Sequence, residues 1–419
     1  MTEWIGAAEA AERLGIKPAS LYAYVSRGVL ARRQEPGGRG SLYDAREIAR
    51  LARRGRPRRA PAGAELVIET AVTEIAAGHL RYRGQDVMEL ATWRSFEEVA
   101  LLLWGASPDE QAQEQAAGPW QATPAALAAG TGAQAALPSR LLPLERLQVI
   151  VPALAATDPL RLHLDPPAVM AAGRALIAGM VDCLPPASGA AAPPEASAGD
   201  AAAGAGAGSI AARLTSALSP GDPPPGLARV VQTALVLLAD HELAASTLAA
   251  RVAASVRADP YAVVATGLGA VGGALHGGAS LAAETMLGLA AEPADAPRVV
   301  GDLLRRGQRI MGFGHFAYPA GDPRSVLLLR ALEEYAPASP RLAVARAVIA
   351  EARRRALPEP NVDFTVAALT SVAGLVPGAG EAIFAVARAA GWIAHALEEY
   401  DGHAPIRPRG VYVGPAAAS

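Results

Sequence analysis

Four short segments of the 419-residue chain place ionisable side chains among apolar residues or glycines, where such groups can do chemistry. In the first segment, 237–247, the pair His241-Glu242 begins a zinc-peptidase pattern. The residue four positions after His241 is Ala245, so the second histidine ligand of that pattern is missing. Two interpretations of His241 stay open: a hydrogen-bonded histidine in the core of an apolar helix, which is the commoner case, or a histidine that faces a ligand.

The second segment surrounds His276 with glycines on both sides, so that backbone or a ligand can approach the imidazole closely. Just upstream, residues 267–272 match the dinucleotide-binding pattern G-x-G-x-x-G, and residues 261–266 before them could form a strand. No βαβ pattern surrounds this match, which argues against a nucleotide-binding unit.

The third and fourth segments carry a histidine and a carboxylate. His315 lies in a glycine loop, 309–318, nine residues before Arg324, and Asp363 lies among apolar neighbours just after two prolines. Burial disfavours the charged form of a carboxyl group, so we expect a raised pKa for Asp363 and a better general base. Taken singly, Arg324 could be a surface ion pair and Asp363 a helix cap.

Helices are expected to position these groups. Hydrophobic residues make up 51% of the chain and charged residues 19%, which allows a large core, while aromatic residues are only 5%. This composition, rich in alanine and glycine, favours closely packed helices over sheet. Helical runs over 95–103, 228–254, 340–356 and 381–399, without strand–helix alternation, predict a mainly α body.

The cellular setting is also constrained by the sequence. The most apolar stretches, 231–250 and 262–290, are interrupted by charged residues and histidines, so they predict buried helices and no membrane span. The single cysteine, Cys183, cannot form an intrachain disulfide, and the N-terminus has no signal-peptide pattern. We therefore expect a cytoplasmic protein.

The N-terminal part differs from the rest in charge. Residues 1–60 hold 13 basic and six acidic side chains, a balance of +7, whereas the whole chain has a net charge of −2. A helix over 7–15, a second over 19–27, a glycine-tipped hairpin around 36–40 and a third helix over 44–51 form the predicted pattern. This arrangement resembles the winged helix-turn-helix of MerR-type regulators. Residues 1–60 could therefore contact DNA, or serve only as a packing appendage.

The body resembles the citrate synthase family over about residues 65–415. The likeness rests on the four segments above together with 81–84, 388–395 and 407–409, which occur in the family's order and spacing. The resemblance implies a two-domain, all-helical body that follows the winged module. The expected parts are the winged helix-turn-helix (1–52), a basic linker (53–64), a large helical domain (65–277 and 379–419) with a flexible Ala/Gly insertion (184–208), and a small helical domain (278–378).

The resemblance also implies a reaction, in which acetyl-CoA condenses with oxaloacetate and water to give citrate and CoA. Asp363 would remove a proton from the methyl group of acetyl-CoA, while His276 hydrogen-bonds the thioester oxygen. His315 would hydrogen-bond and protonate the keto oxygen of oxaloacetate as carbon attacks it. The CoA thioester is then a substrate, and the resemblance implies no metal and no tightly bound cofactor.

Four further residues are implied to bind oxaloacetate. Arg324 and Arg388 would hold its two carboxylates, because a guanidinium matches a planar carboxylate, and His241 would lie beside them. Arg407 would be lent by the partner subunit of a homodimer or a larger homo-oligomer.

Some positions depart from the family pattern. Phe316 and Pro319 stand where many relatives carry basic residues that bind CoA phosphates, and Ala244 stands where an asparagine is common. Two alternatives therefore stay open: a 2-methylcitrate synthase that uses propionyl-CoA, and a DNA-binding regulator with a citrate-synthase-like body as metabolite sensor.

Overall fold

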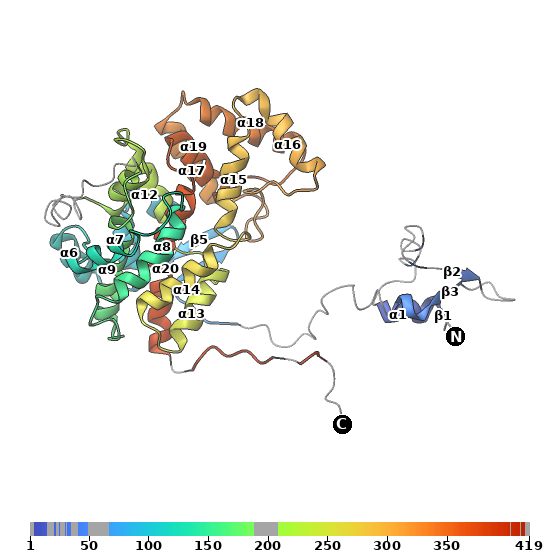
Figure 1. The fold of residues 1–419 in the computed structure, drawn as a ribbon, viewed down its shortest axis with the longest axis horizontal. Helices are drawn as coiled ribbons and strands as arrows, with labels where there is room; N and C mark the ends of the chain where they lie inside the picture. The colour runs from blue at the N-terminus through green and yellow to red at the C-terminus, as the bar shows by residue number, and fades with distance from the viewer. Residues whose placement is uncertain are drawn as a thin grey trace. The chain divides into compact units, whose positions relative to one another are not determined.

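The chain forms two compact units, Met1–Ile68 and Glu69–Ser419, which we describe separately (Figure 1). The computed structural model describes residues 4–14, 21, 25, 30, 32–34, 41–48, 67–187, 208–402, 404–410 and 412–414. Most or all of four predicted segments lie outside these residues: the second helix (19–27), the hairpin tip (36–40), the linker (53–64) and the insertion (184–208).

The N-terminal unit contains a small antiparallel sheet. Its described elements are β1 (Trp4–Gly6), α1 (Ala7–Leu14), β2 (Arg32–Gln34) and β3 (Ser41–Asp44), with strand order β1-β3-β2. The carboxylate of Asp44 accepts the backbone N–H of Arg46 at 2.8 Å, as expected of a residue that begins a helix. The first helix and the paired hairpin strands agree with the sequence pattern, whereas the assignment to a winged helix-turn-helix stays a prediction.

The second unit is a helical body with one small sheet, β4-β5-β6, at its start. Its elements are β4 (Thr73–Ala76), β5 (His79–Tyr82), β6 (Gln85–Asp86), α4 (Val87–Trp93), α5 (Phe96–Trp104), α6 (Pro108–Ala117), α7 (Pro124–Gly132), α8 (Pro143–Ala155), α9 (Pro166–Asp182), α11 (Ile210–Leu218), α12 (Leu227–Leu238), α13 (Ala245–Ser255), α14 (Pro260–Val271), α15 (Gly278–Gly288), η2 (Pro293–Asp295), α16 (Ala296–Arg305), α17 (Pro323–Tyr335), α18 (Pro340–Arg354), α19 (Val362–Ala373) and α20 (Ala379–Asp401). The mainly α fold class predicted for the body is confirmed.

The helix boundaries follow local capping chemistry. Ser95 and Glu98 form a capping box at the start of α5, and the side chain of Asn361 accepts the N–H groups of Asp363 and Phe364 at the start of α19. Such caps bind backbone donors that the first turn of a helix leaves free. The predicted helices over 95–103, 340–356 and 381–399 are confirmed as α5, α18 and α20.

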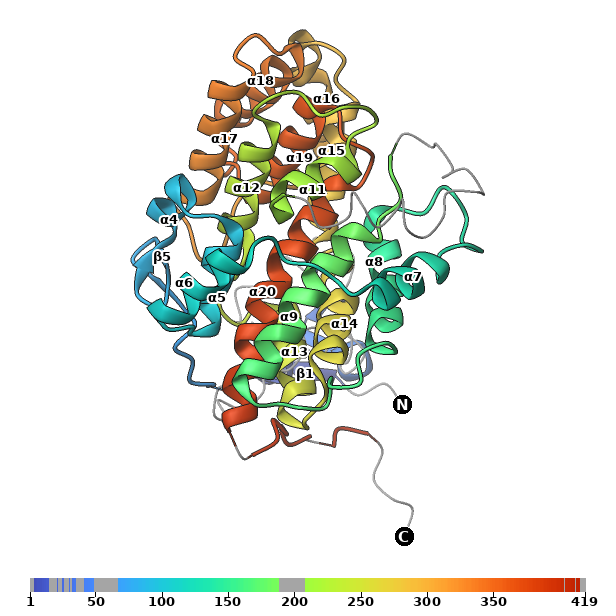
Figure 2. The same cartoon turned by 90° about the vertical axis from the view of Figure 1, so that its left-hand side faces the viewer.

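Helix α20 is the central element of the body. Its side chains are buried from Ala379 to Ala396, and it packs against α5, α8, α9, α12, α13 and α14. Figure 2 shows α15 to α19 gathered at one end of the body, with α20 running from that end alongside α9, α13 and α14. In the described part of the chain, no helix has the length and apolar character needed to cross a membrane.

The nucleotide-binding interpretation of residues 267–272, against which the sequence argued, is excluded. Residues 261–266 belong to α14, so the glycine pattern that follows them is helical and no nucleotide-binding turn forms. At Gly267 in that pattern, a Cβ atom would meet the Trp392 ring at 2.5 Å, so this glycine allows α14 and α20 to pack closely.

One local prediction is wrong, the single helix over 228–254, which is split into α12 and α13. Tertiary partners hold the intervening backbone. The hydroxyl of Tyr82 donates to the carbonyl of Asp240 at 2.9 Å and accepts its N–H at 3.0 Å. In addition, the N–H of Gly391 donates to the carbonyl of Ala239 at 3.1 Å. These contacts take the place of the hydrogen bonds that a continuous helix would make here, and the chain turns at residues 239–244.

Candidate active site

A cavity of about 1070 Å³ opens where the four ionisable segments meet. Six of the seven predicted site residues line it: His241, His276, His315, Arg324, Asp363 and Arg388. The seventh, Arg407, lies exposed in the tail, within residues 404–410, and does not line this cavity.

His241 projects from the turn between α12 and α13. It is buried, its Nε2 lies 3.1 Å from the hydroxyl of Tyr318, and its ring meets that of His315 edge to face at 5.0 Å between centroids. Burial and the charges of Arg324 and Arg388 hold the pKa of His241 well below its usual range, so the ring is neutral. The next residue, Glu242, has a positive φ of 53°, a strained conformation that is commoner at functional sites.

His276 lies in the glycine-rich turn between α14 and α15. Its Nε2 is 2.7 Å from Oγ of Ser246, and that oxygen also accepts the indole N–H of Trp392 at 3.3 Å. Because Ser246 engages Nε2, Nδ1 is the ring nitrogen of His276 that is left for a ligand. Burial, with Arg388 nearby, lowers the pKa of His276 to about 4, so the ring is a neutral donor at pH 7.

His315 leaves the other ring nitrogen for a ligand. The backbone N–H of Ala317 donates to its Nδ1 at 3.1 Å, so the proton of the neutral ring is on Nε2. Burial, followed by the charge of Arg324, lowers the pKa of His315 to about 4. The site therefore holds two half-buried, neutral histidines that leave different ring nitrogens for a ligand, Nδ1 of His276 and Nε2 of His315.

The two arginines have different partners. Arg324 is buried and pairs with Asp322 through Nε at 3.0 Å and Nη2 at 2.8 Å. The carboxylate of Asp322 also accepts the N–H of Val362 at 3.0 Å, which ties the start of α17 to the start of α19. This pairing occupies one edge of the Arg324 guanidinium and fixes its orientation.

The guanidinium group of Arg388 has fewer hydrogen-bond partners. It is 1% exposed, its Nε donates to the carbonyl of Leu238 at 2.9 Å, and its Nη1 has no hydrogen-bond partner among the described residues. Burial lowers the pKa of Arg388 from its ordinary value. A buried cationic N–H group without a partner is costly to the fold, which indicates that an anionic ligand completes it.

Asp363 lies in the first turn of α19. Burial raises the pKa of its carboxyl group to about 6, as the apolar surroundings in the sequence predicted. Its backbone N–H donates to the cap residue Asn361, so it is Asn361 that caps the helix. The carboxylate of Asp363 accepts no hydrogen bond from the described residues and remains free to act as a base.

Four residues of the site were not identified from the sequence: Tyr318, Asp322, Ser246 and Tyr82. Asp322 precedes the α17 helix as its N-cap, and the motif Asp-Pro-Arg could have indicated it. Tyr318 and Ser246 contact His241 and His276 across 77 and 30 positions of chain, and Tyr82 holds the backbone of Asp240, next to His241, across 158 positions. No local pattern carries that information.

The mouth of the cavity is apolar. Leu275 and Phe316 are 96% and 91% exposed, and both line the opening. Arg309, also exposed, is the other cationic residue that lines the cavity besides the two buried arginines. Among the described residues, no three His, Cys, Asp or Glu side chains are grouped so that they could hold a metal ion.

The arrangement suits a specific chemistry. A base with a pKa of about 6 can take a proton from carbon, and two neutral imidazole donors can stabilise negative charge on oxygen. Two buried arginines provide positive charge for an anionic substrate.

Comparison with known proteins agrees with this geometry. The chain is 37% identical over 213 residues to citrate synthase 2 of Bacillus subtilis, which covers 49% of this chain and 56% of that protein. The chain thus spans about half the length of this and other relatives with similar identity. Over 374 residues it is 30% identical to the 2-methylcitrate synthase of Mycobacterium tuberculosis, which covers 83% of this chain and 88% of that protein.

The fold is also shared. The crystal structure of citrate synthase from Thermotoga maritima matches with a TM-score of 0.66 at 25% identity, over 87% of this chain and 98% of that chain. The family model described as "Citrate synthase, C-terminal domain" matches residues 63–409. Because this match covers most of the chain, the protein belongs to the citrate synthase family.

Proposed function

We propose that this protein condenses acetyl-CoA with oxaloacetate and water, giving citrate and CoA. The observation that carries the proposal is the meeting, in one cavity, of a buried base, two neutral imidazole donors and two buried arginines. The thioester is a substrate in this reaction, which needs no metal ion and no bound cofactor.

In the first step, the Asp363 carboxylate takes a proton from the carbon next to the thioester carbonyl. That carbon is a weak acid, so charge must be stabilised on the thioester oxygen as the proton leaves. Nδ1–H of His276 is the donor for this oxygen, because Ser246 engages the other ring nitrogen.

In the second step, the new enol carbon attacks the keto carbon of oxaloacetate. Nε2–H of His315 donates to the keto oxygen and transfers its proton as the alkoxide forms. Arg324, Arg388 and His241 hold the two carboxylates, and the unpartnered Nη1 of Arg388 is a natural donor to one of them. Water then hydrolyses the thioester of the condensed intermediate and releases CoA.

The test is release of free thiol from acetyl-CoA and from propionyl-CoA, each with and without oxaloacetate. We expect thiol release only when oxaloacetate is present, with citrate as the product of the acetyl-CoA reaction. Thiol release that is the same without oxaloacetate would overturn the proposal, because it would indicate simple thioester hydrolysis.

A second candidate is 2-methylcitrate synthesis from propionyl-CoA. It is favoured by the 30% identity to a 2-methylcitrate synthase over 88% of that protein's length. The values of kcat/KM for the two thioesters decide between the candidates. If kcat/KM is higher for propionyl-CoA than for acetyl-CoA, propionyl-CoA becomes the assigned substrate.

We further propose a homodimer in which Arg407 completes the site of the partner. Its exposure in the tail of its own chain supports this, because an arginine that binds substrate must reach a cavity. Mixing an Arg407→Ala variant with an Asp363→Asn variant provides the test. Heterodimers would then contain one intact site, so activity should return on mixing; continued inactivity, with subunit exchange verified, would remove Arg407 from the site.

For residues 1–60 we propose DNA binding through a winged helix-turn-helix, in a protein of the cytoplasm. The support is the +7 balance together with α1 and the antiparallel strands β2 and β3. Deletion of residues 1–60 should change kcat little and abolish retention on DNA, and DNA binding by the full chain should weaken steeply with salt. The regulator alternative would be favoured instead if the full chain bound DNA and oxaloacetate but turned over neither thioester.

A further inference from the structure

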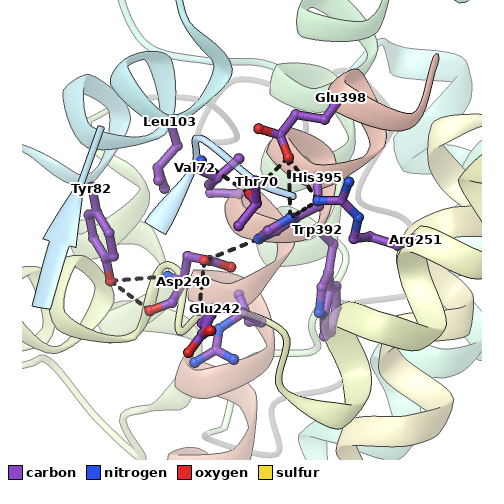
Figure 3. Close-up of polar contacts among 12 residues, drawn as sticks. Thr70, Val72, Tyr82, Leu103, Asp240, Glu242, Arg251, Trp392, His395 and Glu398 are labelled. Carbon is purple, nitrogen blue, oxygen red and sulfur yellow. Dashed lines mark hydrogen bonds and ion pairs between the residues drawn. The ribbon is translucent and has the colours of Figure 1, made fainter. Parts of the chain in front are cut away.

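Behind the cavity, a row of buried polar side chains runs along one face of α20. Figure 3 shows Asp240, His395, Arg251 and Glu398 linked in sequence by hydrogen bonds and ion pairs. His395 is fully buried, with Nε2 at 3.3 Å from Oδ2 of Asp240 and Nδ1 at 2.8 Å from Nη1 of Arg251. None of these four residues lines the cavity or takes part in the chemistry proposed above.

The partners of His395 fix its tautomer. A guanidinium group only donates hydrogen bonds, so Nδ1 of His395 must accept from Arg251, and the ring proton is on Nε2. Arg251 is itself held by Glu399 through Nε at 2.5 Å and by Glu398 through Nη1 at 2.7 Å. Glu398 in turn accepts from the hydroxyl of Thr70 at 2.8 Å and the N–H of Ala71 at 2.7 Å. Nε2–H of His395 is therefore directed at Asp240.

Asp240 belongs to the segment that carries two contacts of the oxaloacetate site. The carbonyl of Leu238 accepts Nε of Arg388, and His241 follows Asp240 directly. Oδ2 of Asp240, the oxygen that faces His395, also accepts the N–H of Glu242 at 3.1 Å and so shapes the strained turn. The position of this one carboxylate thus bears on both Arg388 and His241.

Along α20, Arg388, Gly391 and His395 lie on one helix face, at spacings of three and four residues. Gly391 allows the turn to approach, because a Cβ atom there would overlap the Asp240 carboxylate. The acyl-CoA side of the site is connected differently, through Trp392 and Ser246 to His276.

We propose that His395 is a positioning residue for oxaloacetate binding, acting through the hydrogen bond from its Nε2–H to Asp240. The bond holds the 238–242 segment so that Arg388 and His241 face the dicarboxylate. This inference rests on the proposed function, and it predicts an effect on the oxaloacetate side of the site without an effect on the acyl-CoA side.

Two substitutions of His395 separate this role from simple core packing. In His395→Gln, the amide nitrogen can take the place of Nε2 and still donate to Asp240. In His395→Asn, the amide group lies near the place of Nδ1, so it can meet Arg251 but cannot reach Asp240. Both replace an aromatic ring by a smaller amide, so both lose packing. Asp182→Asn, which weakens a buried ion pair with Arg213 outside the cavity, controls for reduced stability.

The measurements are steady-state kinetics on the full chain, and calorimetric titration of oxaloacetate in the absence of thioester. For His395→Asn we expect the oxaloacetate KM and Kd to rise about tenfold or more, the scale of one lost hydrogen bond to a charged group. The KM for acetyl-CoA should stay within about twofold, and His395→Gln should restore most of the oxaloacetate affinity.

Equal oxaloacetate KM in the Asn and Gln variants would overturn the inference, as would a loss of affinity for both substrates together. If His395→Asn does not fold, the comparison of His395→Gln with Asp182→Asn still decides: near-wild-type oxaloacetate affinity in the Gln variant supports the inference, and a raised KM overturns it. A wild-type chain that neither binds oxaloacetate nor releases CoA would instead refute the proposed function itself.

Discussion

Replacing Arg388 by methionine tests whether the buried guanidinium serves the ligand or the fold. Methionine keeps an unbranched apolar stem of similar length, and the Phe384 ring, whose centroid lies 4.7 Å from the guanidinium carbon, remains to pack against it. The substitution removes a buried cation whose Nη1 has no partner in the described part of the chain, and it breaks the bond from Nε to the carbonyl of Leu238.

These changes have opposite effects on stability. Removing an unsatisfied buried N–H group stabilises the fold by about 1–3 kcal/mol, and loss of the bond to Leu238 costs about 1 kcal/mol. We therefore expect Arg388→Met to leave the free energy of unfolding unchanged or to raise it by up to about 2 kcal/mol. The same change should weaken oxaloacetate binding by about 1.5–3 kcal/mol, which raises KM by about 10- to 150-fold.

Arg213 provides a matched control. It is also buried, but it pairs with Asp182 at 2.5 Å and donates to the carbonyl of Trp120 at 2.7 Å. Arg213→Met strands a buried carboxylate, so it should destabilise the protein by about 3–5 kcal/mol. The oxaloacetate KM of the protein that remains folded should not change.

Urea unfolding with and without oxaloacetate, together with steady-state kinetics, measures both effects. Oxaloacetate should stabilise the wild type and the Arg213 variant by an amount that grows with the logarithm of its concentration over Kd, and at the same concentration it should stabilise the Arg388 variant much less. If Arg388→Met unfolded as easily as Arg213→Met and kept a wild-type KM, Arg388 would be a structural residue and the assignment would be refuted.

Three further predictions concern single positions. Asp363→Asn should lower kcat by at least about 100-fold, and in the wild type kcat/KM should fall as pH drops through about 6, because a protonated Asp363 cannot take a proton. A fall of kcat/KM only near pH 4 would contradict the assignment of Asp363 as the base. Phe316→Arg should lower the KM for acetyl-CoA through a phosphate contact of about 1–3 kcal/mol, and high salt should cancel this gain in affinity. An unchanged KM at low salt would mean that other residues bind the phosphates. Gly391→Ala should destabilise the protein and raise the oxaloacetate KM, since its Cβ overlaps Asp240. Gly288→Ala, in open space at the end of a helix, should be neutral or stabilising by up to about 1 kcal/mol. Equal stability and equal oxaloacetate KM in the two variants would exclude the overlap.

The parts of the fold that could be predicted from sequence are those fixed by local chemistry. Helices α5, α18 and α20 follow from their apolar periodicity, and α5 begins at a capping box that the sequence contains. The raised pKa of Asp363 follows from apolar neighbours within a few residues. The gathering of six distant residues in one cavity was expected from the family resemblance, since spacing alone does not specify a tertiary contact.

The break between α12 and α13 illustrates what local reasoning cannot predict. Residues 228–254 contain no glycine or proline, so nothing within them strongly opposes a continuous helix. The break depends on the hydroxyl of Tyr82, 158 positions away, and on α20 approaching at Gly391. The same break takes His241 out of a helix, and its buried ring lies in the cavity wall with the Tyr318 hydroxyl as its hydrogen-bond partner.

Helix α20 nevertheless contains a signal for this arrangement. It is buried on all sides for much of its length, yet it carries Arg388, His395 and Glu398 at helical spacing. Polar groups on a buried face need partners, because each unsatisfied group costs about 1–3 kcal/mol. His395 and Glu398 find theirs within the protein, and Nη1 of Arg388 has none among the described residues. On one helix face, the satisfied positions thus pair with other protein groups, and the unsatisfied position is the one that we expect a substrate carboxylate to complete.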